Sequence, residues 1–184
     1  MYASQDLINE HEGILFGLTI LEKMANEVEQ LEEIEVRDIE EMVNFFKLFA
    51  DKCHHGKEEG LMFPAMERVG VSNEEAPMEQ LMLEHEEGRK YIAGMDFSIN
   101  NGALEGEKFI LAARSYISLM RGHIDRENSI LFPLGDKLIP MEEQKQLLEK
   151  FEEFEEIVMG EGIHEKLHEL LHDFEAKYLK AIEH

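Results

Sequence analysis

The chain has 184 residues and a formal charge of −23, because 41 acidic side chains face 18 basic ones. A field of that sign repels nucleic-acid phosphates and anionic lipid headgroups, so neither is expected as a partner. No stretch approaches the ~20 apolar residues that cross a bilayer. A single cysteine excludes an internal disulfide, and the first residues carry no basic segment followed by an apolar run, so a cytoplasmic location is expected.

Helices are predicted along almost the whole chain, because apolar residues recur at three- and four-residue spacing and strand-like alternation is absent. Ser4 fits the N-cap of the first helix, and Pro77 fits the first turn of the third. Pro64 is expected to kink or end the second helix. The expected helices cover about residues 4–31, 36–68, 77–99, 104–138, 141–159 and 162–182.

Four long helices with short links predict an all-α fold, an up-down-up-down four-helix bundle over about residues 4–138. The last two helices are expected as a C-terminal appendage over about residues 139–184. A chain of this length suits one domain, so residues 1–184 are predicted to form a single unit.

Two parts of the chain repeat each other. CHHGKEEGLMFP at 53–64 and GHIDRENSILFP at 122–133 share a histidine, a glutamate four residues later and a closing Phe-Pro. NEHEGI at 9–14 and LEHEEG at 83–88 also match, so the repeating unit is a helix pair of ~70 residues. Two copies related by an approximate two-fold axis would direct equivalent side chains toward one centre.

The repeated residues predict a metal site. Helical residues four apart lie on one face about one turn, or ~5.4 Å, apart, so each His-x3-Glu can offer a nitrogen and a carboxylate to one ion. A lone histidine also stands within the apolar stripe of the first and of the third helix. Buried ionisable groups need a partner of opposite charge, and a cation is the usual one. The predicted ligands are His11, His54, Glu58, His85, His123 and Glu127.

A second register exists on the second helix, because His55 and Glu59 are also four apart. Aligning the shared Phe-Pro places His54 over His123 but His55 over Ile124, so the first register is chosen. His55 and Glu59 are left with two interpretations, as hydrogen-bonding groups around the ligands or as surface residues.

Other candidate ligands are predicted to lie outside this centre. Cys53 is displaced by ~100° from its neighbouring ligand and is expected to be a small buried apolar residue. His164, His168 and His172 begin at the margin of an apolar stripe and drift by ~40° per step toward its polar side. That drift favours surface positions over a second metal site.

The pattern EHE, HHGKEEGLMFP, EHEEGR and HIDRENSILFP resembles the hemerythrin-like (HHE cation-binding) family over about residues 4–138. The resemblance implies a non-haem di-iron centre with two iron ions and an oxo or hydroxo bridge. Manganese or zinc are alternatives, since imidazole and carboxylate suit all three metals. The family resemblance also implies binding of dioxygen or nitric oxide, sensing of oxygen or iron, or a part in repair of damaged iron–sulfur clusters.

The chain departs from the oxygen-carrying members, which place two histidines four apart on the third helix and a more widely spaced His and Asp on the fourth. Leu81 and Arg89 stand at that distance from His85. Four histidines, two bridging glutamates and a bridging oxygen leave about two of roughly twelve coordination places open, one on each ion. This count favours a substrate or water on both ions over plain reversible oxygen carriage.

The leading hypothesis is therefore a di-iron protein that binds O2, NO or H2O2 at open iron positions, in oxygen or redox chemistry or in sensing. In it Glu58 and Glu127 bridge the ions, His11 with His54 serves one, and the other two histidines serve the second. Whether it turns over a substrate as an enzyme is left open. The alternative is an iron-handling or iron–sulfur cluster repair protein without catalytic turnover. The sequence names neither an electron donor nor a protein partner.

Overall fold

The structure is a computed structural model that describes residues 1–180. A two-stranded antiparallel hairpin, β1 (Ile99–Asn100) with β2 (Ala103–Leu104), is its only strand pairing within that range. The helical elements, with π-helical segments written η, are α1 (Ala3–Glu29), α2 (Val36–Phe45), η1 (Phe46–His55), η2 (Glu58–Met62), α3 (Phe63–Arg68), α4 (Met78–Phe97), α5 (Gly106–Arg126), η3 (Glu127–Leu131), α6 (Phe132–Leu138), α7 (Met141–Met159), α8 (Ile163–Phe174) and η4 (Glu175–Leu179).

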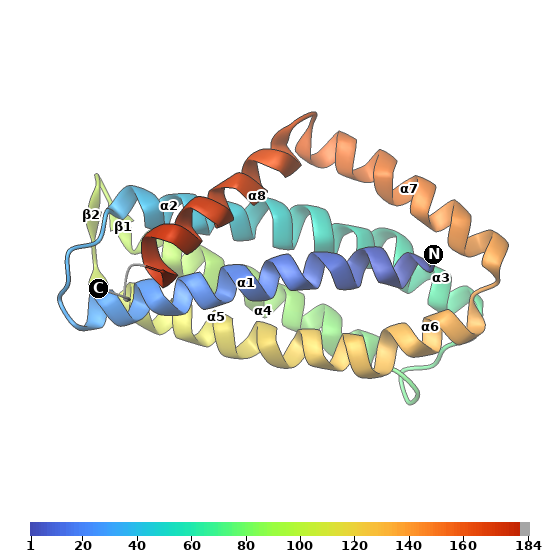
Figure 1. Cartoon of the computed structure of the whole chain (residues 1–184). Coiled ribbons are helices and arrows are strands. Elements are labelled where there is room, and N and C mark those ends of the chain that lie inside the picture. The colour runs from blue at the N-terminus through green and yellow to red at the C-terminus, as the bar shows by residue number, and fades with distance from the viewer. Residues whose placement is uncertain (181–184) are drawn as a thin grey trace.

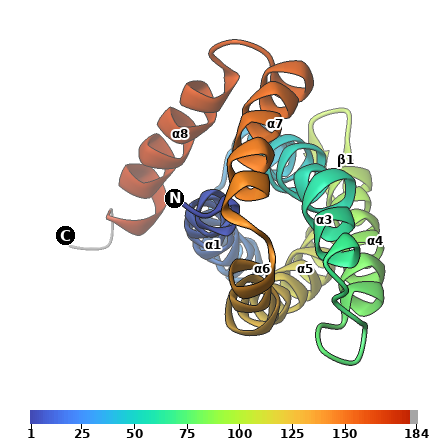
Figure 2. The ribbon, with the colours of Figure 1, turned by 90° about the vertical axis from the view of Figure 1, so that its right-hand side faces the viewer.

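Four long helical rods form a bundle (Figure 1). Rod 1 is α1, rod 2 runs from α2 through η1 and η2 to α3, rod 3 is α4, and rod 4 runs from α5 through η3 to α6. Seen along the bundle in Figure 2, α7 lies beside α1 and rod 2, and α8 lies on the outer side of α1. The predicted all-α bundle is confirmed. No helix within residues 1–180 is long and apolar enough to cross a membrane.

Rod 2 passes Pro64 without ending, although a proline removes one backbone hydrogen bond and crowds the preceding turn. The π-helical segment η2 ends two residues before it, and Pro64 then stands in the first turn of α3. Rod 4 repeats this arrangement, with η3 followed by Phe132 and Pro133 at the start of α6. A π-helical turn widens the helix just where the proline ring needs room, which explains why both rods continue.

Several predicted boundaries are wrong by a few residues. Ser4 is not an N-cap, because α1 has already begun at Ala3, and its buried hydroxyl donates to Asp136 Oδ1 at 2.5 Å. Rod 4 begins at Gly106, two residues late, because Leu104 pairs with Ile99 in the small hairpin. The predicted end of the last helix at residue 182 lies outside the described residues, as does the end of the predicted appendage.

The core has two apolar halves separated along the bundle axis. One half packs around Phe46 and Tyr116, and the other packs around Phe63 and Phe132. Between them every rod contributes buried polar side chains, which we call the polar layer: His11, His54, His55, Glu58, His85, His123 and Glu127. Helix α8 adds apolar residues to the first half, and α7 adds Leu147 and Phe151 to the second.

Candidate metal centre

The six predicted ligands all lie in the polar layer, and none has more than 1% of its surface exposed. They come from all four rods, so the repeat does place equivalent side chains at one centre. Their ligand atoms form two groups, each with its atoms within 4.8 Å of one another. One group joins His11 and His54 with Glu58 and Glu127, and the other contains Glu58, His85, His123 and the additional His55.

The two glutamates lie between these groups. Glu58 has Oε1 3.2 Å from His54 Nε2 and Oε2 3.2 Å from His85 Nε2. Glu127 has Oε2 3.1 Å from His11 Nε2 and Oε1 3.1 Å from His123 Nε2. Each carboxylate therefore presents one oxygen to each side, as a group that bridges two cations must.

The ring orientation of the four predicted histidines is fixed from outside the layer. The Nδ1–H of His54 donates to Glu10 at 2.7 Å, and that of His123 donates to Glu84 at 2.8 Å. The Nδ1–H groups of His85 and His11 donate to Glu59 at 2.8 Å and to Asn128 at 2.7 Å. The proton is assigned to Nδ1 because an oxygen accepts it, which leaves each Nε2 directed inward, where it could bind a metal.

These orienting groups follow the same two-fold repeat as the ligands. Glu10 and Glu84 each precede one of the predicted histidine ligands, and Glu59 and Asn128 each follow one of the two glutamates of the polar layer. Each orients a histidine of a neighbouring rod. Glu59 is therefore a hydrogen-bonding group around the predicted ligands, the first of the two interpretations that the sequence left open for it. The roles of Glu10, Glu84 and Asn128 were missed, although the repeated EHE triplet and the Phe-Pro alignment were the signals that could have revealed them.

The family model described as Hemerythrin HHE cation binding domain matches residues 3–135. The chain belongs to this family. No curated protein and no solved structure matches the chain. The hemerythrin-like resemblance is therefore confirmed, and with it a metal-binding helical protein.

The donor atoms of this hemerythrin domain fit a metal better than they fit one another. The distances between their nitrogen and oxygen atoms are those of ion pairs, but the angles are not those of hydrogen bonds. The buried atoms without a hydrogen-bond partner in the described chain include Nε2 of His11, His54 and His55 and both carboxylate oxygens of Glu58 and Glu127. Such groups cost free energy when buried alone, and imidazole with carboxylate is a donor set for iron, manganese or zinc.

His55 is the ligand candidate that sequence analysis set aside. It is 2% exposed, and its ring stacks on His85 with centroids 3.8 Å apart and planes 13° apart. Burial, reinforced by the nearby His85, lowers its pKa well below 6.5, so its imidazole is neutral and has a nitrogen lone pair to offer. The surface interpretation is wrong. The alignment of the two Phe-Pro ends excluded His55 because its counterpart is Ile124, but rod 2 is π-helical up to His55, so both His54 and His55 are buried in the layer.

Considered without a metal ion, the histidines of the centre hold the protons that balance the charge of the two carboxylates. Burial lowers the pKa of His54, but Glu58 and Glu10 outweigh it and raise it to about 10. The pKa of His85 shifts in the same direction, because the nearby carboxylates of Glu127, Glu58 and Glu59 outweigh burial and raise it to about 11. The two carboxylates thus require positive charge beside them, which bound metal ions would supply.

A further ring of cations keeps the orienting carboxylates ionised. The pairs are Glu10 with Lys57, Glu59 with Arg89 and Glu84 with Arg126. Burial raises the pKa of Glu84, but hydrogen bonds from His123 and Arg126 lower it to about 2. An ionised carboxylate makes the imidazole it holds a stronger metal ligand.

Apolar side chains enclose the layer. The ring of Phe132 stacks on His11 with centroids 5.5 Å apart, and that of Phe63 stacks on His85 at 5.9 Å. Both belong to the Phe-Pro ends of the repeat. Cys53 is fully buried, and burial raises the pKa of its thiol to about 12, so it stays protonated and acts as a small apolar residue as predicted.

Proposed function

We propose that the chain is a non-haem di-iron protein that binds a small diatomic or peroxide ligand, O2, NO or H2O2, in oxygen or redox chemistry or in sensing. One observation carries the proposal: two groups of buried nitrogen and oxygen donors share Glu58 in the polar layer, and most of these atoms have no hydrogen-bond partner in the described chain. Iron is favoured by the donor set and by family membership, and manganese and zinc are the alternatives that elemental analysis distinguishes.

The proposal assigns Glu58 and Glu127 as bridges, because each has one oxygen on either side of the layer. His11 and His54 would hold one ion. His85 and His123 would hold the other, together with His55.

The fifth histidine changes the number of places left for an exogenous ligand. Five histidines, two bridging glutamates and one bridging oxygen would leave about one open place among roughly twelve. That place falls on the ion held by His11 and His54, the side with two histidines. The objection to reversible oxygen binding from the four-histidine count therefore no longer holds.

When bound, the iron pair supplies the change of oxidation state and the Lewis acidity. The chain's own residues bind and orient. Glu10 and Asn128 hold the two imidazoles on the open side through their Nδ1–H groups. Phe132 covers His11 and limits the access of water, so a small uncharged molecule is favoured over a large or strongly hydrated one.

Iron handling or iron–sulfur cluster repair without turnover is the alternative, and it requires metal that leaves readily. All proposed ligands are buried, and four of the five histidines are held by a further hydrogen bond of 2.7–2.8 Å. These features favour a metal that dissociates slowly from the protein. Slow removal of iron by an excess of chelator is expected, whereas release within the mixing time would support the donor role.

Iron loading tests the proposal directly. Protein loaded with Fe(II) without air and then oxidised should hold two irons per chain and develop near-ultraviolet charge-transfer absorption that shifts with azide. Glu58→Gln should lose both properties, because it removes a bridge between the two ions. Glu67→Gln, at an exposed position of α3, should retain them. A single metal per chain with no spectral change on oxidation would contradict the proposal.

His55→Gln tests the assignment of the fifth nitrogen. The variant should still bind iron but respond to azide with a second binding step, because a second place has opened. An azide titration identical to that of the parent protein would remove His55 from the ligand set. Steady-state consumption of O2 or peroxide in the presence of a reductant would then separate an enzyme from a sensor.

A further inference from the structure

Two histidines on α8 face each other outside the polar layer. His164 and His168 are one helical turn apart, and their Nε2 atoms are 2.7 Å apart with ring centroids at 4.5 Å. Two imidazole nitrogens at this distance repel each other unless a proton or a cation lies between them. The α-helical drift calculated from sequence does not separate them, because both line one pocket together with residues of α1, η1 and α7.

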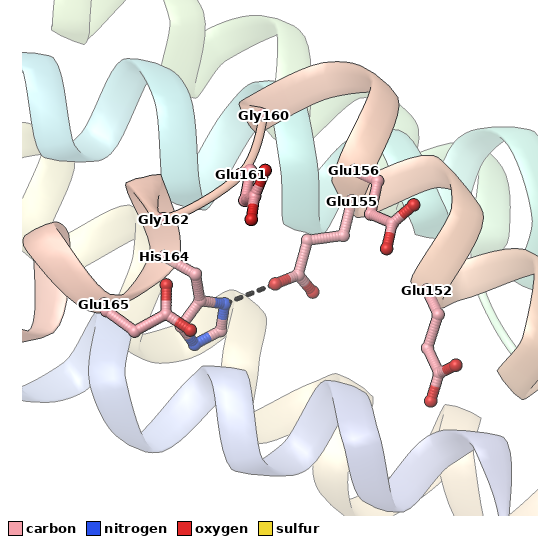
Figure 3. A pocket seen from close by; sticks show the side chains of 8 residues that line it. All are labelled: Glu152, Glu155, Glu156, Gly160, Glu161, Gly162, His164 and Glu165. Carbon is pink, nitrogen blue, oxygen red and sulfur yellow. Dashed lines mark hydrogen bonds and ion pairs between the residues drawn. The ribbon is translucent and has the colours of Figure 1, made fainter.

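His164 is oriented as the histidines of the polar layer are. Its Nδ1–H donates to Glu155 Oε1 on α7 at 2.5 Å, which Figure 3 shows as the dashed line between the two helices. Its Nε2 is then left with a lone pair, which faces the Nε2 of His168. In the polar layer His123 has the same arrangement, with Nδ1 held by Glu84 and Nε2 3.1 Å from the Nε2 of His85. A carboxylate behind a histidine is the usual support of a metal-binding imidazole.

The surroundings of this pair suit a cation. Both histidines line a pocket of about 250 Å³ together with the oxygen-bearing side chains of Asp6, Asn9 and Glu10. On its other side His164 borders a hollow of about 310 Å³, where Figure 3 shows glutamates from both α7 and α8 around it. Phe49 packs edge-on against both imidazole rings and limits their rotation. Lys57 pairs with Asp6, Glu10 and Glu155, and the other glutamates around the hollow keep the region negative, which concentrates cations.

We propose that His164 and His168 form a second divalent-cation site, separate from the polar layer, with Glu155 as the positioning residue of His164. Two imidazole nitrogens select a borderline transition metal such as Cu²⁺, Ni²⁺ or Zn²⁺ over Mg²⁺ or Ca²⁺. Water completes the coordination of the cation. The site rests on its own contacts and does not depend on which metal occupies the polar layer.

Copper titration tests the site on the full-length protein with the metal content of its centre measured before and after. We expect one additional Cu²⁺ per chain, with a paramagnetic resonance spectrum that shows two coordinating imidazole nitrogens. His164→Gln and His168→Gln should each weaken this binding at least ~10-fold, and Glu155→Gln should weaken it ~10-fold or more through the lost support. Zn²⁺ should compete for the same site.

His172→Gln is the matched control, because this histidine lies on the same helix with its side chain 77% exposed and should leave copper binding unchanged. Circular dichroism checks that each variant keeps its helices. Copper binding that is equal in the parent protein and in both His164→Gln and His168→Gln would overturn the proposal. Copper uptake matched by loss of metal from the centre would overturn it as well, since the ion would then lie in the polar layer.

Discussion

At the residue scale, the partner of Nδ1 decides what a histidine can do in this protein. Where an oxygen accepts that proton, Nε2 is left with a lone pair and a fixed direction, as in His11, His54, His85 and His123. In the polar layer the acceptor comes each time from another helical rod. The packing of the rods therefore directs each Nε2 toward the place where a metal would bind. His164 has the same support from α7.

His164 gives the molecule a pH-dependent contact between α7 and α8. Its hydrogen bond to Glu155 raises its pKa above 6.5 despite partial burial, and the charges of Glu10 and Glu165 add to this effect. On the other side of the ring, its Nε2 contacts the Nε2 of His168. A raised folded-state pKa means that the stabilisation is fully present below about pH 6.5 and is lost as pH rises through the folded value. Because the side chain is one-third exposed, solvent screens part of this contribution.

We therefore expect the free energy of unfolding of the parent protein, with the metal content of its centre held fixed, to fall relative to His164→Gln as pH rises above about 6.5. Urea unfolding at several pH values measures this difference. A parent-minus-variant difference that does not change between pH 6 and 9 would contradict this role of His164.

At the element scale, two glycines of α1 differ in what surrounds them. A Cβ on Gly17 would lie 2.8 Å from Cε1 of Phe45, whose side chain is buried and cannot move into solvent. A Cβ on Gly13 would make an ordinary contact of 3.6 Å with Phe49. Gly17 therefore permits the close approach of rods 1 and 2, whereas Gly13 is open to a methyl group.

Gly17→Ala is expected to lower the free energy of unfolding by about 1–3 kcal/mol, because the added methyl group overpacks the apolar core. Gly13→Ala, in the same helix, should leave stability unchanged or raise it by up to about 1 kcal/mol, since alanine is the better helix former. Denaturant unfolding of the two variants makes the comparison. Equal effects of the two substitutions would show that Phe45 does not confine Gly17.

Sequence periodicity predicted the helices well, and the repeat predicted six residues that lie together in the polar layer, because both are local or symmetric patterns. His54 and Glu58, for example, could be assigned from the second copy of their own motif. His55 could not be assigned, because its direction depends on the π-helical geometry of η1, and a repeat has no counterpart for it at Ile124. Likewise the pairing of His164 with Glu155 depends on how α7 packs against α8, which no period within either helix encodes.

At the scale of the whole molecule, the polar layer divides the apolar core into two halves. Each half has its own aromatic packing, and the four rods pass through the layer between them. In the layer the rods meet mainly through imidazoles and carboxylates, among them Glu58 and Glu127, whose oxygens lack hydrogen-bond partners in the described chain. Metal ions held there would join all four rods at the level where apolar contacts are fewest.

Metal occupancy should therefore raise the stability of the entire bundle. A ligand that binds only the folded state stabilises it by about 2.7 kcal/mol at a free concentration 100 times its Kd. We expect iron-loaded protein to melt at a higher temperature than protein stripped by a chelator, with Glu67→Gln behaving as the parent. Glu58→Gln/Glu127→Gln, which removes both charged carboxylates while keeping their shape, should show little or no difference between the two states. Calorimetry measures both melting temperatures, and an undiminished metal-dependent shift in the double variant would place the stabilising ion outside the polar layer.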